Sequence, residues 1–308
     1  MSFKNAFKLL LSRFSCVWAI LLYLAVMFVV LLSLGLTFLL PVIRSFSAAG
    51  IGDMFNKAIL SLLNGASVAE TLAQLAAIGE EIRMIFSTDR NTFLNSALFV
   101  VLVATVAYRF IMGLYELPLI SVIQGIMSDN ARYGYMARYV SLLGKSVPFS
   151  LVKMFVMTIY DFIMYAAVFY LTRLVGYFSL ILAPFVFMLS LLLLLSLRYS
   201  LIAGWSPAVI VDGKNIFEAL WFSVKRAFAH FGSIFSMYLI VWIIVIAFNF
   251  IIGTFTFLTG LLVTVPMSMF FINLLNMTFY YGRSGKSYYV DNGVYKPETL
   301  KKESDLKE

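Results

Sequence analysis

Residues 196–218 read SLRYSLIAGWSPAVIVDGKNIFE, and they form an unusual end to a long hydrophobic segment. Arg198 follows a leucine-rich run, Trp205 and Pro207 close that run, and a polar turn then leads into a further helix. A charged side chain is costly inside a membrane, so each such residue is a candidate functional residue by default. Whether Arg198 belongs to a site depends first on whether the chain spans a membrane.

The composition is that of a membrane protein. Of the 308 residues, 62% are hydrophobic and 12% are charged, whereas soluble domains are about half apolar and about a quarter charged. The chain has one cysteine and one histidine, which excludes an internal disulfide and a metal site made from the usual His and Cys ligands. We therefore expect no metal, no cofactor and no catalytic residues, and an enzyme is the least favoured class of protein.

Six segments are long and apolar enough to cross the hydrocarbon core, which takes roughly 20 helical residues. They lie near residues 17–42, 93–115, 151–172, 177–204, 233–254 and 258–280. If the N-terminus is inside, most basic residues flank the cytoplasmic ends of these spans, and both termini are cytoplasmic. The net charge of +8 then reflects topology, and we expect no nucleic-acid partner.

A short basic amphipathic stretch precedes every second span. The three stretches are FKNAFKLLLSRF (3–14), YMARYVSLLGKSVPF (135–149) and NIFEALWFSVKRAFAHFG (215–232). This repetition predicts an all-α integral membrane fold with three helical hairpins, each preceded by an amphipathic elbow helix in the cytoplasmic interface. Residues 1–282 would form this six-span membrane domain, and residues 283–308 a charged cytoplasmic tail. The elbow helices either only anchor the spans or also contact lipid phosphates.

The segment 44–91 between the first two spans is expected to be a helical, amphipathic, extracytoplasmic loop. Ser67 and Glu70 have the spacing of a capping box, and Asn64-Gly65 is a helix stop signal. Two amphipathic helices at this place would lie on the outer leaflet, cap the bundle or bind a partner. The charged tail is the other candidate surface for a protein partner.

The opening stretch resembles a pattern in several bacterial membrane families. In them a span ends in an Arg-Tyr pair, and a short turn of the type "iivd" and an elbow helix of the type "eAL..S" follow. The matching residues here are Arg198, Tyr199, Val209, Ile210, Val211, Asp212, Glu218, Ala219, Leu220 and Ser223. The glycerophosphoryl diester phosphodiesterase membrane-domain families, and neighbouring families of unknown function, are similar in this way. The resemblance covers roughly 70 residues, and it implies a fold and a bacterial cytoplasmic membrane without an enzymatic activity, since the catalytic domain is absent.

Three charged residues are the main candidates for a ligand-binding site. Asp161 is the only acidic residue deep in a predicted span, about 12 Å along a helix from Lys153. Arg109 and Arg198 each lie about 10 Å inside the cytoplasmic end of their spans. Either the arginines extend to the inner head groups and Asp161 is protonated or paired with one of them, or the three residues share a polar cavity open to the cytoplasm or the inner leaflet. Such a cavity would have one positive charge left for an anionic group.

Asn273 and Asn276 in the last span are weaker candidates. They lie three residues apart and therefore share one face of a helix that also contains Pro266. A proline inside a span frees a backbone carbonyl and allows a kink around a cavity. The alternative is ordinary hydrogen bonding between spans, and that interpretation is favoured.

Two functions fit these observations. The first is a permease-like protein that handles a lipid or a small anionic or amphipathic solute from the inner leaflet or the cytoplasm. The second is a membrane scaffold or accessory subunit of an envelope complex, without transport. Membrane lipids are the expected partners in both cases. A cavity lined by Arg109, Asp161 and Arg198 would favour the first function, and side chains directed toward head groups would favour the second.

Overall fold

The computed structural model describes residues 2–65, 67–88, 90–129, 134–179, 181–290 and 293–296. Six helical segments in it are long and apolar enough to cross a membrane, which supports an all-α, multi-pass membrane protein. These segments are Ser15–Ala48, Phe93–Asp129, Tyr135–Phe178, Ala183–Val211, Phe231–Phe255 and Leu261–Arg283.

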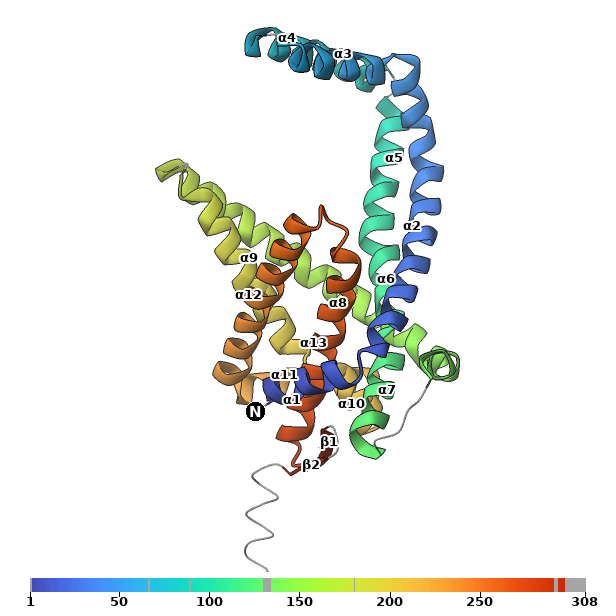
Figure 1. Cartoon of the computed structure of the whole chain (residues 1–308), viewed down its shortest axis with the longest axis vertical. Coiled ribbons are helices and arrows are strands. Elements are labelled where there is room, and N and C mark those ends of the chain that lie inside the picture. The colour runs from blue at the N-terminus through green and yellow to red at the C-terminus, as the bar shows by residue number, and fades with distance from the viewer. Residues whose placement is uncertain are drawn as a thin grey trace, which may run out of the picture. The chain divides into compact units, whose positions relative to one another are not determined.

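The helices follow one another along the chain with short connections, and one π-helical turn, η1, lies within the second span (Figure 1). The elements are α1 (Ser2–Ser12), α2 (Ser15–Ala48), α3 (Ile51–Leu63), α4 (Val68–Thr88), α5 (Arg90–Leu102), η1 (Val103–Ala107), α6 (Tyr108–Leu114), α7 (Glu116–Asp129), α8 (Tyr135–Phe178), α9 (Ala183–Ile202), α10 (Trp205–Val211), α11 (Ile216–Ala229), α12 (Phe231–Phe255), α13 (Leu261–Arg283), β1 (Tyr288–Val290) and β2 (Gly293–Tyr295).

The chain forms two compact units. The first contains the residues up to Ala25 together with those from Phe110 onward, and the second is Val26–Arg109. The unit boundaries lie inside the first two spans, and the separation of a membrane domain (residues 1–282) from a charged tail stays a prediction. Most of the predicted tail, including residues 297–308, lies outside the described residues.

The second unit contains the predicted loop as two helices, α3 and α4, which pack against each other at the end of α2 and α5. Ile51, Ala58 and Ile78 form a small buried cluster between them. The start of α4 is capped reciprocally: Ser67 Oγ accepts from the Glu70 amide at 3.2 Å, and Glu70 Oε2 accepts from the Ser67 amide at 3.0 Å. These two bonds are the capping box that the S-x-x-E spacing predicts.

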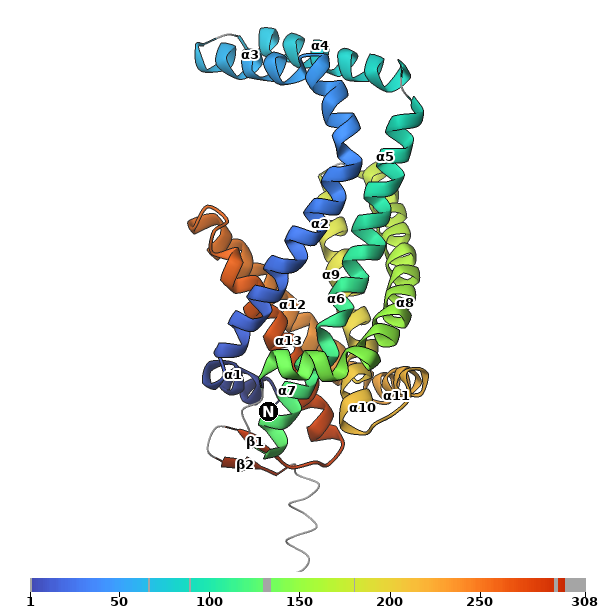
Figure 2. The same cartoon turned by 90° about the vertical axis from the view of Figure 1, so that its right-hand side faces the viewer.

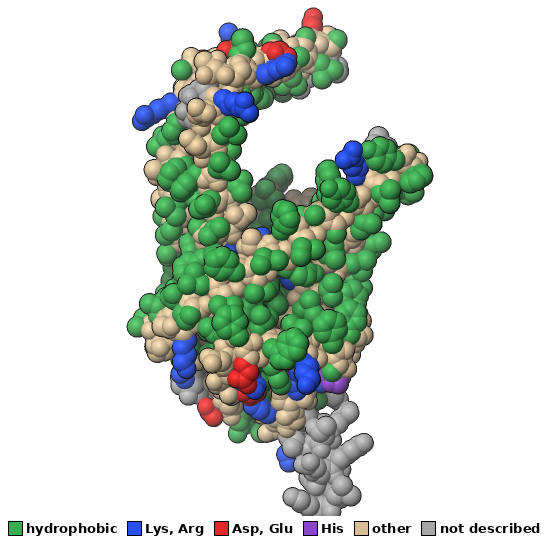
Figure 3. Space-filling model, turned by 180° about the vertical axis from the view of Figure 1, so that it is seen from behind, with side chains coloured by type: hydrophobic (Ala, Val, Ile, Leu, Met, Phe, Trp, Pro, Cys, Tyr) green, Lys and Arg blue, Asp and Glu red, His purple; other side chains and the backbone are tan. Residues whose placement is uncertain are grey.

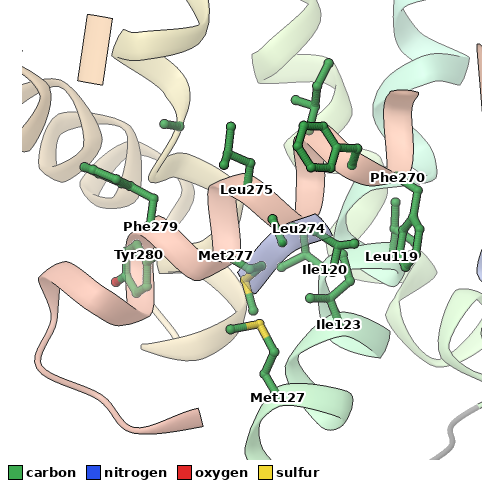
Figure 4. Packing of buried hydrophobic residues seen from close by; sticks show 14 of the residues in the cluster. Leu119, Ile120, Ile123, Met127, Phe270, Leu274, Leu275, Met277, Phe279 and Tyr280 are labelled. Carbon is green, nitrogen blue, oxygen red and sulfur yellow. The ribbon is translucent and has the colours of Figure 1, made fainter. Parts of the chain in front are cut away.

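The core of the first unit lies at the end where α1, α7, α10, α11 and the two strands meet, which we call the base (Figure 2). Phe270, Leu274 and Met277 of α13 repeat at helical spacing and face Ile120 and Ile123 of α7 (Figure 4). Toward the other end the spans keep exposed apolar side chains, which suits a surface in contact with lipid (Figure 3). Charged side chains of this unit gather mainly at the base.

Two features of the first unit differ from the sequence-based expectation. The stretch 135–149 is not a separate elbow helix, because α8 runs through Pro148 as one helix of 44 residues. A proline inside a helix removes one hydrogen bond and bends the helix without having to end it, and Figure 2 shows this bend. The predicted tail also contains a small antiparallel pair, β1–β2, in which Tyr288 lies opposite Tyr295. Aromatic and β-branched residues favour such strands.

Candidate functional site

Asp161 and Arg198 form an ion pair between two adjacent spans. Asp161 lies in α8 and Arg198 in α9, and the two helices pack along each other. Arg198 Nη1 lies 2.7 Å from Asp161 Oδ1, and the exposed fractions of the two side chains are 21% and 6%. A pairing of Asp161 with one of the two arginines, which the first of the two interpretations of these residues includes, is therefore present.

Aromatic side chains surround the arginine. The Arg198 guanidinium lies 5.3 Å from the ring centre of Tyr199, within the range of a cation–π contact. The ring of Tyr199 in turn packs 4.9 Å from that of Trp242 on α12. Next to Asp161, the Tyr160 hydroxyl donates to the Leu194 carbonyl at 2.7 Å and ties α8 to α9. These contacts fix the position of the ion pair between three helices.

Two nitrogen donors near this pair are buried without a hydrogen-bond partner among the described residues: Arg198 Nε and Trp242 Nε1. A buried donor without an acceptor costs about 1–3 kcal/mol, and more for a charged group. Arg198 uses one terminal nitrogen for Asp161, so its Nε donor is still available to a further acceptor. An anionic oxygen is the acceptor that suits a guanidinium best.

Arg109, the third predicted member, belongs to the second unit, whereas Asp161 and Arg198 belong to the first. The described site therefore consists of one positive and one negative charge. The prediction that Arg109 adds a second positive charge stays a prediction.

Asn273 and Asn276 lie in α13 and are engaged within the helix bundle. Asn273 Nδ2 donates to the Met269 carbonyl at 2.8 Å, and its side chain also bonds to the Tyr115 side chain. Asn276 Oδ1 accepts a hydrogen bond from the Tyr238 hydroxyl of α12. These bonds agree with the interpretation favoured from the sequence, in which the asparagines form ordinary hydrogen bonds within and between spans. None of the contacts described for Asn273 and Asn276 involves Arg198.

A polar cluster on α12 and α13 has the same character. Asn249 Nδ2 donates to Ser268 Oγ at 3.0 Å, and Thr264 Oγ1 donates to Asn249 Oδ1 at 2.7 Å. Ser268 Oγ also donates to the Thr264 carbonyl at 2.7 Å. Because each member bonds to another, the cluster joins the two spans and has little capacity left for a solute.

Sequence reasoning missed a second buried ion pair, between Glu116 of α7 and Lys153 of α8. Glu116 is 8% exposed, and it directly follows the break between α6 and α7. From the sequence alone, Glu116 is only a polar residue at the expected cytoplasmic end of the second span. The nine-residue separation of Arg109 from Pro118 recurs between Arg198 and Pro207, and this repeated spacing is a signal that could have located the breaks.

Both breaks share one local structure. At the first break, Ser150 of α8 donates to the carbonyl of Phe110, which lies three residues before Gly113. At the second break, Ser223 of α11 donates at 2.7 Å to the carbonyl of Leu201, which lies three residues before Gly204. Each serine packs closely against its glycine, so that a Cβ on Gly113 would lie 2.9 Å from the Ser150 Cβ. The hydroxyl therefore binds a carbonyl that the helix end leaves unpaired.

A separate charged cluster lies at the base, after α10. Lys286 Nζ lies 2.6 Å from Asp212 Oδ1, and the Tyr280 hydroxyl donates to the other carboxylate oxygen. Burial alone would raise the pKa of Asp212, but the hydrogen bonds from Lys286 and Tyr280 outweigh it and lower that pKa below its ordinary value. This pair ties the segment that follows α13 to the polar turn at the end of α10.

No family model, curated protein or solved structure matches the chain. The likeness to the glycerophosphoryl diester phosphodiesterase membrane-domain families is therefore an expectation from the residues between Arg198 and Ser223 alone. Function has to be argued from the charged site itself.

Proposed function

We propose that the protein is permease-like and takes up an anionic lipid, or a small anionic or amphipathic solute, from the inner leaflet or the cytoplasm. One observation carries the proposal: Arg198 is held inside the bundle by Asp161 while its Nε donor is buried without a partner. A phosphate or carboxylate oxygen that reached this donor would make a charge-assisted hydrogen bond.

The choice of arginine supports this role. A guanidinium presents several donors in one plane, so it can hold a carboxylate on one side and an anionic ligand on the other. A lysine ammonium has no planar fork and would have to divide a single point charge between the two anions. Asp161 offsets the cost of placing the guanidinium in a span when no ligand is bound.

The proposal includes a membrane orientation. The base faces the cytoplasm, both termini are cytoplasmic, and the membrane is the cytoplasmic membrane of a bacterium. The six spans form three hairpins, and α1 and α11 are interfacial elbow helices, because each is amphipathic and directly precedes a span. Lys and Arg residues gathered at the base agree with this orientation.

A second candidate function is that of a scaffold or accessory subunit, and a different observation favours it. Helices α3 and α4 of the second unit keep large apolar side chains exposed, namely Phe55, Ile59, Leu60, Leu63, Leu72, Leu75, Met84 and Phe86. A surface of this kind suits either the outer leaflet or a membrane-protein partner. Under this function the Arg198–Asp161 pair would only join α8 to α9.

Substitutions at Arg198 test the proposal. Purified protein carrying Arg198→Leu, Arg198→Lys or the control Arg173→Leu is examined by native mass spectrometry with phosphatidylglycerol and phosphatidylcholine. Arg173 is a suitable control because it lies toward the opposite end of α8 from the base and contacts Tyr177. We expect Arg198→Leu to weaken the retention of one phosphatidylglycerol molecule about tenfold, the equivalent of one charge-assisted bond, and Arg198→Lys to restore it only in part.

Equal retention by the lysine variant and the wild type would contradict the role of the planar fork. If none of the variants changes retention or uptake of an anionic solute, the pair is structural and the scaffold function is preferred.

A further inference from the structure

A groove of about 240 Å³ lies in the first unit, between the amphipathic helix α1 and the last two spans. Its walls are formed by Phe3, Phe7 and Leu10 of α1, Ile244, Val245 and Phe248 of α12, and Met267, Ser268 and Phe271 of α13. Eight of these nine side chains are apolar. The groove is separate from Arg198, which does not line it.

The single polar wall residue does not offer a binding group to a solute. Ser268 Oγ donates to the Thr264 carbonyl and accepts from Asn249 Nδ2, so its hydroxyl is already used within the bundle. A groove without available donors or acceptors favours a hydrocarbon occupant, because a polar solute would lose its hydrogen bonds to water there.

Contacts with the core and with α13 hold α1 in place beside the groove. Ala6, Leu9 and Leu10 are buried against the core, and the Asn5 Nδ2 atom donates to the Tyr288 hydroxyl at 2.8 Å, which fixes the helix over α13. The ring of Phe3 packs edge-on against Phe271 at 5.3 Å. Helix α1 is therefore held in place, with one side of it forming a wall of the groove.

Two lysines stand beside that wall. Lys4 and Lys8 are exposed, and they lie one turn apart on the stripe of α1 that adjoins Phe3 and Phe7. No acidic residue lies in α1. Two ammonium groups next to an apolar groove are complementary to a lipid with an anionic head group and an acyl chain, and each basic residue near an anionic membrane surface adds about 1 kcal/mol.

We propose that this groove binds one acyl chain of an anionic phospholipid, whose phosphate is held by Lys4 and Lys8. A helix of a partner protein does not fit inside it, because one turn of a helix that is about 10 Å across and about 5.4 Å long occupies roughly 400 Å³, which is more than the whole groove. The bound lipid stabilises α1 on the last two spans. This site is independent of the proposed ligand site at Arg198, so either can fail without the other.

The experiment uses the full-length protein in nanodiscs and a phospholipid with a photoreactive diazirine on one acyl chain, with either a phosphatidylglycerol or a phosphatidylcholine head group. Crosslinked peptides of α1, α12 and α13 are then quantified by mass spectrometry. Ile244→Trp fills the groove, and Lys4→Gln with Lys8→Gln removes the two charges. Ile251→Trp is the matched control, because Ile251 is exposed on the same helix and does not line the groove.

We expect the wild type to crosslink phosphatidylglycerol several times more than phosphatidylcholine at these peptides. Ile244→Trp should abolish crosslinking of both lipids, the double lysine variant should lower phosphatidylglycerol to the level of phosphatidylcholine, and Ile251→Trp and Arg198→Leu should match the wild type. Unchanged crosslinking in Ile244→Trp, or equal crosslinking of the two lipids in the wild type, would overturn the proposal. Thermal unfolding of each variant in detergent confirms that it is folded.

Discussion

The two places where a span breaks near the base are built alike in one respect and differently in another. At both, a serine from the second helix after the break donates to a carbonyl at the helix end and packs against a glycine, Ser150 of α8 with Gly113 and Ser223 of α11 with Gly204. At the first break a buried ion pair, Glu116–Lys153, joins α7 to α8. At the second, Trp205 occupies the corresponding place, and its Nε1 donates to the Ile216 carbonyl at 2.9 Å.

The difference concerns what each charged pair is needed for. The Glu116–Lys153 pair belongs to the joint at the first break, so it has a structural task. The second break is already joined by Trp205 and Ser223, both buried, and Arg198 and Asp161 lie further along the spans. A costly pair that the joint does not need is a better candidate for ligand binding than a pair that the joint requires.

The largest effect is expected at the first break. Glu116→Ala leaves Lys153 buried without its partner, and removing one member of a buried pair costs about 3–5 kcal/mol. We expect Arg198→Leu to cost clearly less stability, because the second break stays joined by the Trp205 and Ser223 hydrogen bonds. Thermal unfolding in detergent, followed by tryptophan fluorescence, measures both.

The double variant Glu116→Leu with Lys153→Met controls for the loss of charge. It should recover most of the stability, because replacing both members of a buried pair by apolar residues is often neutral. If Glu116→Ala and Arg198→Leu destabilise the protein equally, the distinction between a structural and a functional pair is wrong.

A medium effect is expected from the glycines. Gly113→Ala places a Cβ 3.0 Å from the Ser150 Cα, a backbone atom that cannot move aside easily, and overpacking of this kind costs about 1–3 kcal/mol. At the second break the nearest atom to such a Cβ is the Ser223 Oγ at 3.4 Å, so Gly204→Ala should cost less than about 1 kcal/mol. Fluorescence-detected gel filtration after heating ranks the two variants, and the reverse order would show that the two serines do not approach their glycines in this way.

The smallest effect concerns pH, at the charged cluster that follows the second break. The folded pKa of Asp212 is below its ordinary value, so its carboxylate stabilises the fold above about pH 4, the pKa of an unfolded aspartate. This contribution is lost as the pH falls through the folded pKa. The melting temperature of Asp212→Asn should therefore fall less between about pH 4 and pH 3 than that of the wild type. The shift is small because the group is largely solvated, and parallel curves would show that the Lys286 contact is not made in solution.

The hydrophobic segments alone were sufficient to predict the six spans and the helices α3 and α4, because span length and amphipathic spacing are local properties. The pairing of Asp161 with Arg198 was foreseen as a possibility from their similar depth on successive spans. The Glu116–Lys153 pair and the Ser150–Gly113 contact were not foreseen, because they depend on which faces of α7 and α8 meet. Likewise, the stretch 135–149 was predicted as a separate elbow helix before the span near 151–172, whereas α8 continues through Pro148.

The central claim is that Arg198 is retained for an anionic ligand and not only for Asp161. Exchanging the two residues, Asp161→Arg with Arg198→Asp, keeps both charges and the contact between α8 and α9 but moves the guanidinium to the other helix. The exchange is made in the Lys4→Gln, Lys8→Gln background, in which the groove beside α1 no longer prefers phosphatidylglycerol. We predict that the exchanged protein melts close to this background and has lost the remaining preference for phosphatidylglycerol over phosphatidylcholine in native mass spectrometry. A folded exchange variant that retains this preference in full would contradict the claim.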